Sequence, residues 1–269
     1  MKTFQSLVLA SIFAVGLGLA AMSAAGEEAA KPAAAEKAPA TGTKPLRVLF
    51  IGNSLTATGN IPAAIQHLAA AAKESRPLEF ERVILGGATF EKHLENGKAL
   101  KYIQKGNWDF VVLNEMSTRA LREREPMFKA GRKLIEEIKK VNAKPVIYMT
   151  WALKEKPAEF AAVIANCRDL GKETGAAVVP VGVAWQTIVK NNPEIDLYTS
   201  DGKHPRLEGS YLAACTFYGF FYGKPSAGLT SEFTLSDPHA DAKPHEYKIP
   251  AEVAAKLQKA ADEAMKAEK

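Results

Sequence analysis

Cysteine is scarce in this sequence: only two of the 269 residues are cysteines, Cys167 and Cys215. No cysteine lies near the apolar N-terminal segment, so we expect no lipid attachment at a new N-terminal cysteine. Both cysteines fall on apolar helical stripes, which favours two separate buried thiols. A disulfide between them is the alternative for a chain exported to an oxidising compartment.

A large excess of charge of one sign is also absent. The formal net charge is +5, which is small for this length, and acids alternate with bases in stretches such as RALREREPMFKAGRKLIEEIKK. This alternation is typical of a solvated helix face rather than of a nucleic-acid-binding surface. The Gly-Lys-Ser/Thr ending of a P-loop is missing too, which argues against a nucleoside triphosphate. We therefore expect no nucleic-acid partner.

The first 25 residues are typical of a signal peptide. Lys2 precedes an apolar run over 7–22, and Ser-Ala-Ala at 23–25 provides the small residues that a signal peptidase cuts. An uncleaved anchor helix is the alternative, but it needs about 20 apolar residues, and this run is shorter. We predict cleavage near Ala25, export to the periplasm or secretion, and no stable membrane insertion of the mature chain.

Residues 26–44 are predicted to form a linker, because they are rich in Ala, Pro and Lys and lack large apolar side chains. The predicted folded domain spans 45–269. It ends in a polar, proline-rich extension and an amphipathic helix that begins at Ala251. We find no internal repeat and no second domain in the sequence, and the oligomeric state stays open.

Five short apolar runs alternate with longer helical patterns from residue 45 onward. The runs have the length and composition of strands, and the segments between them repeat apolar residues three and four positions apart. The predicted strands are 47–51, 79–85, 110–113, 145–151 and 177–181. Continuous apolar strands separated by helices predict an α/β protein with a parallel sheet that is covered on both sides.

The carboxyl ends of the strands are the expected location of the site in such a sheet. Polar residues and glycines directly follow several predicted strands: Ser54, Gly86, Gly87, Asn114, Glu115 and Thr150. We therefore expect these residues to lie along one edge of the sheet.

The loop after the first predicted strand, SLTATGN, has two interpretations. Its Thr-Ala-Thr-Gly-Asn part resembles the loop with which flavodoxins hold the FMN phosphate, whereas Ser54 at the strand end suits a nucleophile. Two observations disfavour FMN. The export signal has no twin arginine, which a cofactor loaded before export usually requires, and a second motif, SDGKHPRLEGSYLAA, would stay unexplained.

That second motif places Asp201 and His204 three residues apart, in a loop directly before a helical pattern. This spacing lets the carboxylate accept the Nδ1 proton of the histidine and leaves Nε2 free as a base. A serine is a poor nucleophile until a neighbouring base takes its proton. The pattern therefore predicts Ser54 as the nucleophile, His204 as the base and Asp201 as the group that orients the base.

Together these residues resemble the SGNH/GDSL hydrolase superfamily over 45–228. GNSLT stands where the family has its Gly-Asp-Ser-Leu block, GGATF matches the glycine block, VVLNEMS the asparagine block and DGKHP the Asp-x-x-His block. The resemblance implies a flavodoxin-like three-layer sandwich with a five-stranded parallel sheet. It also implies an oxyanion hole made by the backbone N–H groups of Ser54 and Gly87 and by an asparagine side chain, which we assign to Asn114. We assign no metal and no cofactor to the site.

Two positions depart from the family pattern. Asn53 replaces the usual aspartate beside the serine, and an asparagine can accept similar hydrogen bonds. The Gly-x-Asn-Asp sequence is absent, and Asn114 follows its strand earlier than the family spacing. Because one oxyanion donor is worth about a hundred- to a thousandfold in rate, Glu115 or the backbone after it is kept as an alternative in shaping the hole.

The pattern gives little support for a catalytic or metal-binding role of the remaining histidines. His67 and His93 lie on predicted helices and are interpreted as packing or surface residues. His239 and His245 lie in a polar segment, DPHADAKPHEY, without clear metal-ligand spacing, and are interpreted as parts of a mobile loop.

The sequence thus predicts an exported serine esterase that cleaves O-acyl esters, such as acetyl groups on carbohydrates, from a small molecule or a glycan. Trp151 and Trp185 follow strand ends and either line a sugar or acyl pocket or pack in the core. The missing Gly-x-Asn-Asp motivates one alternative, a non-catalytic carbohydrate- or ligand-binding protein on the same fold. An FMN-binding flavodoxin-like protein is the third hypothesis.

Overall fold

A computed structural model of this protein describes residues 43–236 and 244–268. The predicted signal peptide, almost all of the predicted linker and His239 lie outside the described residues. Thr43 and Lys44 already hydrogen-bond to the turn that precedes the second strand. Residues 43 and 44, at the end of the predicted linker, therefore already contact the folded domain.

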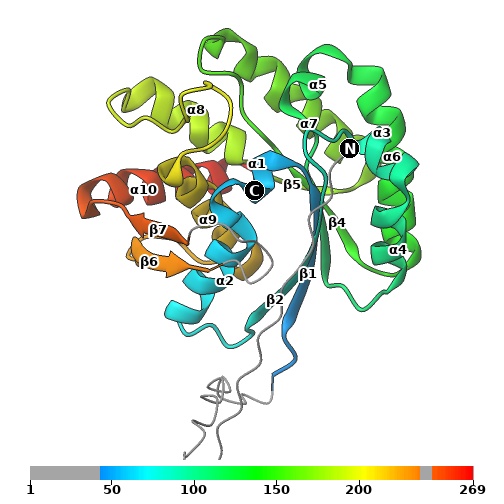
Figure 1. The fold of residues 1–269 in the computed structure, drawn as a ribbon, viewed down its shortest axis with the longest axis horizontal. Helices are drawn as coiled ribbons and strands as arrows, with labels where there is room; N and C mark the ends of the chain where they lie inside the picture. Colours follow the sequence, from blue (N-terminus) through cyan, green and yellow to red (C-terminus); the bar gives the residue numbers. More distant parts are fainter. Residues whose placement is uncertain (1–42, 237–243, 269) are drawn as a thin grey trace, which may run out of the picture. The chain divides into compact units, whose positions relative to one another are not determined.

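Five parallel strands form the central sheet, in the order β2-β1-β3-β4-β5. The strands are β1 (Leu46–Gly52), β2 (Leu78–Ile84), β3 (Phe110–Leu113), β4 (Lys144–Tyr148) and β5 (Ala177–Val179). The neighbouring strands β1 and β3 are almost entirely buried, because helices cover both faces of the sheet (Figure 1). The predicted fold class, a three-layer α/β sandwich around a five-stranded parallel sheet, is confirmed.

The helices divide into two groups, one on each side of the sheet (Figure 1). The first group is α2 (Ile61–Ala71), α8 (Val181–Asn191), α9 (Leu207–Tyr222) and α10 (Ala251–Ala267). The second group is α3 (Phe90–Asn96), α4 (Lys98–Gln104), α5 (Ser117–Arg122), α6 (Arg124–Lys140) and α7 (Phe160–Thr174). In the first group α9 contacts α2, α8 and α10, so it is the central helix of that layer.

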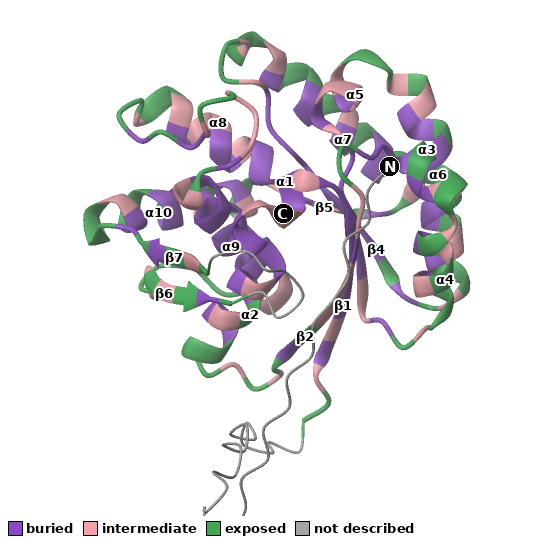
Figure 2. Ribbon diagram, viewed as in Figure 1, coloured by how far each residue is buried: buried purple, intermediate pink, exposed green. Residues whose placement is uncertain are grey.

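The buried fraction of a helix depends on how many other helices and strands pack against it. Helix α9 has neighbours on several sides, and most of its length is buried (Figure 2). Its Phe217 packs edge-on against Phe50 of β1 and Tyr148 of β4, with ring centroids 5.8 Å and 4.9 Å away. Helix α6 buries only one face, which includes Leu134 and Ile138, and exposes its charged residues to solvent.

Three elements differ from the predicted ones by more than one residue. The helical pattern between the second and third predicted strands is two helices, because Gly97 has a left-handed backbone with φ of 71° that ends α3 and begins α4. The fourth strand ends at Tyr148, before Trp151. The fifth strand ends at Val179, because the next residue is the N-cap of α8, a helix that the sequence analysis did not predict.

The C-terminal extension contains a β-hairpin in which β6 (Glu232–Leu235) pairs antiparallel with β7 (His245–Lys248). The interpretation of His245 as part of a mobile loop is therefore wrong. Tyr247 of β7 is fully buried and stacks on Phe233 of β6, with ring centroids 4.4 Å apart. Its hydroxyl donates to the Gly59 carbonyl at 2.6 Å, which joins the hairpin to the segment after β1.

Cys167 of α7 and Cys215 of α9 are separate, buried free thiols, as the favoured interpretation expected. Burial raises the pKa of Cys167 to about 12, so this thiol stays protonated. Among the helices that the structure describes, none is long and apolar enough to cross a bilayer.

Candidate active site

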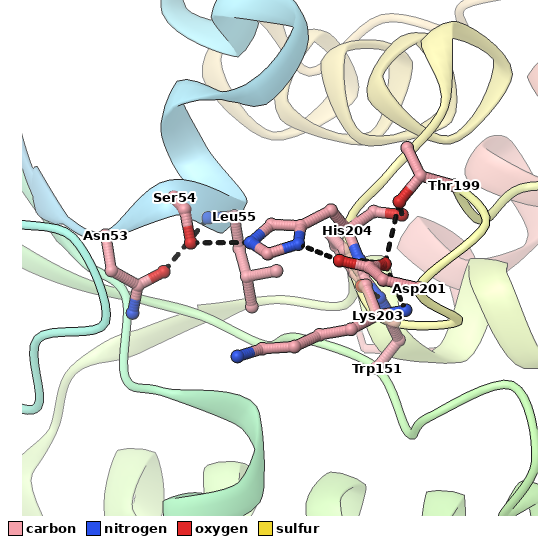
Figure 3. Close-up of polar contacts among 8 residues, drawn as sticks. All are labelled: Asn53, Ser54, Leu55, Trp151, Thr199, Asp201, Lys203 and His204. Atoms are coloured by element: carbon pink, nitrogen blue, oxygen red, sulfur yellow. Dashed lines mark hydrogen bonds and ion pairs between the residues drawn. The ribbon is translucent and has the colours of Figure 1, made fainter.

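The turn that carries Ser54 begins directly at the end of β1. Asn53 is the N-cap of a one-turn helix, α1 (Ser54–Ala57), and its Oδ1 accepts from the Leu55 N–H at 3.0 Å (Figure 3). Its Nδ2 donates to the Ala88 carbonyl at 3.0 Å, and the side chain is buried. An asparagine suits this position better than an aspartate, because one amide both accepts from the nucleophile turn and donates to the loop after β2.

Two glycines let this turn pack closely against its neighbours. A Cβ on Gly52 would lie 2.7 Å from the Thr56 hydroxyl and 2.9 Å from Cβ of Asn114. Gly59 has φ of 73°, and a Cβ there would lie 2.3 Å from the Ser210 hydroxyl. A short 3-10 segment over Thr58–Asn60 then leads into α2, so the helix that starts at Ser54 contributes the partial charge of one turn only.

Ser54, His204 and Asp201 form a hydrogen-bonded chain (Figure 3). His204 Nε2 lies 2.8 Å from Ser54 Oγ, and His204 Nδ1 lies 2.5 Å from Asp201 Oδ2. These contacts join a residue after β1 to a loop about 150 positions later in the chain. The structure therefore brings together the three residues that the sequence analysis selected for nucleophile, base and orienting acid.

The second carboxylate oxygen of Asp201 organises the loop itself. Oδ1 accepts from the Thr199 hydroxyl at 2.7 Å and from the backbone N–H groups of Lys203 and His204, both at 2.9 Å. The hydrogen bond from the His204 ring, together with these three, holds the pKa of Asp201 well below its ordinary value. The carboxylate is therefore ionised at neutral pH, and His204 Nδ1 carries the shared proton.

The tryptophans support this loop from inside the core. Trp151 and Trp185 are both buried and stack with ring centroids 3.7 Å apart. The Trp151 indole N–H donates to the Lys203 carbonyl at 3.0 Å, and the Tyr198 hydroxyl donates to the Ala152 carbonyl at 2.9 Å. Of the two interpretations of these tryptophans, core packing is the one that the structure supports.

The loops after β1, β2 and β3 are tied to one another at the carboxyl edge of the sheet. Asn114 is buried, its Oδ1 accepts from the Thr56 hydroxyl at 2.9 Å, and its Nδ2 donates to the Glu115 carbonyl at 3.0 Å. One amide hydrogen of Asn114 is therefore left for a ligand. Thr150, after β4, instead packs against α8, where a Cβ on Gly182 would lie 2.1 Å from its carbonyl oxygen.

Two backbone donors in these loops have no acceptor among the described residues. Within the part of the chain that the structure describes, neither the Ser54 N–H nor the Gly87 N–H donates to another residue. The space beside the glycines is open, since a Cβ on Gly86 or Gly87 would meet no atom within 4 Å. These N–H groups are thus available to a negatively charged oxygen that approaches from solvent.

The candidate site is exposed rather than enclosed. The side chain of Asp201 is 47% exposed and that of His204 is 29% exposed. A depression of about 310 Å³ is lined by Asp201, Leu153 and Lys154, but not by Ser54 or His204. A larger cavity of about 710 Å³ lies between α7, α9 and α10, and no residue of the hydrogen-bonded chain lines it.

The two remaining described histidines on helices have structural roles. His93 is fully buried and its Nε2 contacts the Gly52 carbonyl at 3.0 Å, so it holds the end of β1. His67 stacks on Phe233 of the hairpin, with ring centroids 4.4 Å apart. Among the described residues, no group of three His, Cys, Asp or Glu side chains is arranged to hold a metal ion.

Three contacts that support the site were not predicted: those of the Trp151 indole, of the Tyr247 hydroxyl and of the donor side of the Asn53 amide, whose acceptor role was expected. Each acts on a backbone carbonyl of a loop that is distant in sequence. No local spacing marks such a contact, because any residue type can supply the carbonyl. Only the unusual asparagine beside Ser54 was a visible signal.

Comparison with known proteins supports the same architecture. No protein-family model and no curated protein matches this chain. Among solved structures, a protein from Slackia heliotrinireducens assigned to the SGNH hydrolases matches with a TM-score of 0.54 and 28% identity, over 64% of this chain and 96% of that one.

Two further solved structures share the fold at lower identity. A DUF4886 family protein from Bacteroides uniformis matches with a TM-score of 0.63 and 18% identity, over 82% of this chain and 95% of that one. An acetyl xylan esterase matches with a TM-score of 0.56 and 18% identity, over 65% and 99%. The predicted resemblance to the SGNH/GDSL superfamily is thereby confirmed.

Proposed function

We propose that this protein, whose fold is that of the SGNH/GDSL hydrolases, is a serine esterase that removes small O-acyl groups. The observation that carries the proposal is the unbroken chain from Ser54 Oγ to His204 Nε2 at 2.8 Å and from His204 Nδ1 to Asp201 Oδ2 at 2.5 Å. Both distances are short enough for proton transfer and for orientation of the base.

The reaction follows from these contacts in two steps. Ser54 Oγ attacks the ester carbonyl while His204 Nε2 takes the hydroxyl proton, and the same proton then passes to the leaving alcohol. Water next attacks the acyl-Ser54 ester, again losing a proton to His204, and the carboxylic acid leaves as Ser54 regains its proton. Asp201 keeps the imidazole in the correct tautomer and stabilises its positive charge.

Negative charge that develops on the carbonyl oxygen needs preorganised donors. The unpaired N–H groups of Ser54 and Gly87 supply two, and the remaining amide hydrogen of Asn114 supplies a third in this proposal. One such donor is worth about a hundred- to a thousandfold in rate.

The exposure of the site suggests the substrate class. Among the described residues, none has an atom within 4 Å of a Cβ built on Gly86 or Gly87, so the space beside these glycines is open and the alcohol part of the ester can be large. A bulky polar alcohol, such as an acylated carbohydrate, fits this open site. Two of the similar structures are named as an acetyl xylan esterase and an acetyl-xylooligosaccharide esterase. Export by the predicted signal peptide would place such an enzyme outside the cytoplasm, where glycans occur.

The first test is the intact mass of the protein after exposure to a fluorophosphonate. A single adduct is expected on the wild type, and none on Ser54→Ala or His204→Ala, because the probe reacts only with an activated serine. The same two variants should no longer hydrolyse p-nitrophenyl acetate. The wild type should hydrolyse p-nitrophenyl acetate faster than p-nitrophenyl octanoate. A folded wild type without an adduct would refute the proposal.

The two alternatives have weaker support. A non-catalytic binding protein would not need Ser54 and His204 within hydrogen-bonding distance, and here they are 2.8 Å apart. In the FMN interpretation the loop over 56–60 would hold a phosphate, yet its Thr56 hydroxyl and Gly59 carbonyl are bonded to Asn114 and Tyr247. Colourless purified protein would exclude a bound flavin.

A further inference from the structure

Glu115 is a buried carboxyl group to which the proposed reaction gives no role. It follows Asn114 at the end of β3, and only 4% of the residue is exposed. Carboxylates are rarely buried so completely unless they are paired or hydrogen-bonded. Its contacts therefore indicate what it does.

The Glu115 carboxylate binds backbone N–H groups from two different loops. Oε1 accepts from the Met116 N–H at 2.7 Å, in the loop after β3. Oε2 accepts from the Phe90 N–H at 3.2 Å, and Oε1 lies 3.3 Å from the same nitrogen. Phe90 is the first residue of α3 and directly follows the loop over 86–89, which carries Gly87. One side chain thus connects the glycine loop to the asparagine loop.

The glycine loop is therefore held at two points. Its Ala88 carbonyl accepts from Asn53, beside Ser54, and the N–H of Phe90 donates to Glu115, beside Asn114. The position of the Gly87 N–H relative to Ser54 depends on both ties. Removing either one frees the loop on that side, because a Cβ at Gly86 or Gly87 would meet no packing neighbour within 4 Å.

We propose that Glu115 is a positioning residue of the oxyanion site, whose ionised carboxylate holds the loop that carries Gly87 against the loop that carries Asn114. This inference rests on the proposed esterase function. When the carboxyl group is protonated, it loses its negative charge and one oxygen becomes a donor, so its hydrogen bonds from the Phe90 and Met116 N–H groups weaken. The tie between the two loops is then weaker, and the oxyanion donors are less well placed.

The surroundings of Glu115 set the pH at which this happens. Burial raises its pKa to about 7, against the opposing effect of the Met116 and Phe90 N–H groups. The charged or titratable groups that act on it are Arg119 of α5, Glu91 of α3 and the Cys167 thiol of α7. Arg119 is itself paired with Glu91 at 2.6 Å and with Glu123 at 3.0 Å, so its charge stabilises Glu115 only in part.

The first measurement uses Ser54→Ala protein and needs no activity. The backbone amide signals of Phe90 and Met116 are followed by ¹⁵N NMR between pH 5 and pH 9. We expect both signals to shift with a common midpoint near pH 7, because both amides bond to the same carboxylate. Signals that stay fixed over this range would overturn the inference even if the esterase assignment holds.

The second measurement is catalytic and compares Glu115→Gln with Glu91→Gln. The amide keeps one acceptor but directs NH₂ at a backbone N–H, so we expect kcat for p-nitrophenyl acetate to fall about ten- to a hundredfold, with KM changed less than about threefold. In the profile of kcat against pH, the ionisation of Glu115 should be missing from the acidic limb. Glu91, an exposed neighbour on α3 that also pairs with Arg119, is the matched control, and its variant should keep the wild-type kcat.

The outcomes separate the two proposals. The wild type could be inactive and form no fluorophosphonate adduct while the Phe90 and Met116 amide signals still shift with pH. This outcome would refute the esterase function but leave the contact between the two loops supported. An active wild type with an equally active, folded Glu115→Gln variant would refute the positioning role. If Glu115→Gln does not fold, the titration on Ser54→Ala still decides, because it leaves Glu115 intact.

Discussion

Replacing Asp201 by asparagine should disable the base without disturbing the loop. Three donors converge on Oδ1 of Asp201: the Thr199 hydroxyl and the backbone N–H groups of Lys203 and His204. The amide oxygen of Asp201→Asn is expected to stay at that position, so its NH₂ group faces His204 Nδ1. Nδ1 must then be unprotonated, Nε2 carries the proton, and the imidazole can no longer accept a proton from Ser54.

The expected loss of rate follows from the free-energy cost of turning the side-chain amide of Asp201→Asn into the opposite orientation. Turning the amide round would leave three donors without their acceptor, and a hydrogen bond contributes about 1 kcal/mol. The wrong tautomer is therefore favoured by about 3 kcal/mol, which corresponds to a rate loss of about a hundredfold. Loss of the negative charge beside the imidazolium adds to this, so we expect kcat to fall by at least about a hundredfold.

Hydrolysis of p-nitrophenyl acetate near neutral pH measures this loss, and a thermal melt provides the control. Because asparagine keeps the three hydrogen bonds of the loop, the melting temperature should change by less than about 4 °C. Asp201→Asn protein that melts like the wild type and keeps kcat within about fivefold would refute the reasoning, since the tautomer would then not depend on this side chain.

Two further predictions concern the ties between the loops. Asn53→Asp should lower the free energy of unfolding at neutral pH by about 1–3 kcal/mol, because a carboxylate oxygen would face the Ala88 carbonyl in a buried position. Urea denaturation measures this change, and unchanged stability would contradict the Asn53 contacts. Glu115 has a folded-state pKa raised from 4.5 to about 7, so burial of its protonated form contributes stability that is full below pH 4.5 and is lost as pH rises through 7. Wild type should therefore lose up to about 3 kcal/mol relative to Glu115→Gln between pH 4.5 and pH 8, and parallel stability profiles would contradict this.

The fold could be predicted from the sequence where the signal was local. The runs at 47–51 and 110–113 are continuously apolar, and both are strands buried under helices on both faces. Helix α8 was missed because Pro180 and the preceding valines read as a longer strand. The hairpin was missed because β7 has alternating charged residues around a single buried residue, Tyr247, so its sequence is typical of a polar loop.

Those contacts of the site that join residues close together in the sequence could be predicted. Asp201 and His204 are three residues apart, and the contact between their side chains follows from that spacing. The geometry around Asn114 could not be predicted, because it depends on the Thr56 hydroxyl and on the register between β1 and β3. The burial of Glu115 likewise depends on where α3 and α5 pack, which no pattern near Glu115 encodes.

The packing of the hairpin against the nucleophile turn sets an order of assembly. Ser54 is synthesised early, whereas its base lies 150 residues later, and the Tyr247 hydroxyl that holds the Gly59 carbonyl lies 188 residues beyond it. A growing chain folds from its N-terminal side as synthesis proceeds, so for most of that time the serine has neither a proton acceptor nor a fixed turn. A chain cut short before the hairpin would retain the base but lack this brace. Ser54 therefore gains its base and its fixed turn only after most of the chain has been synthesised.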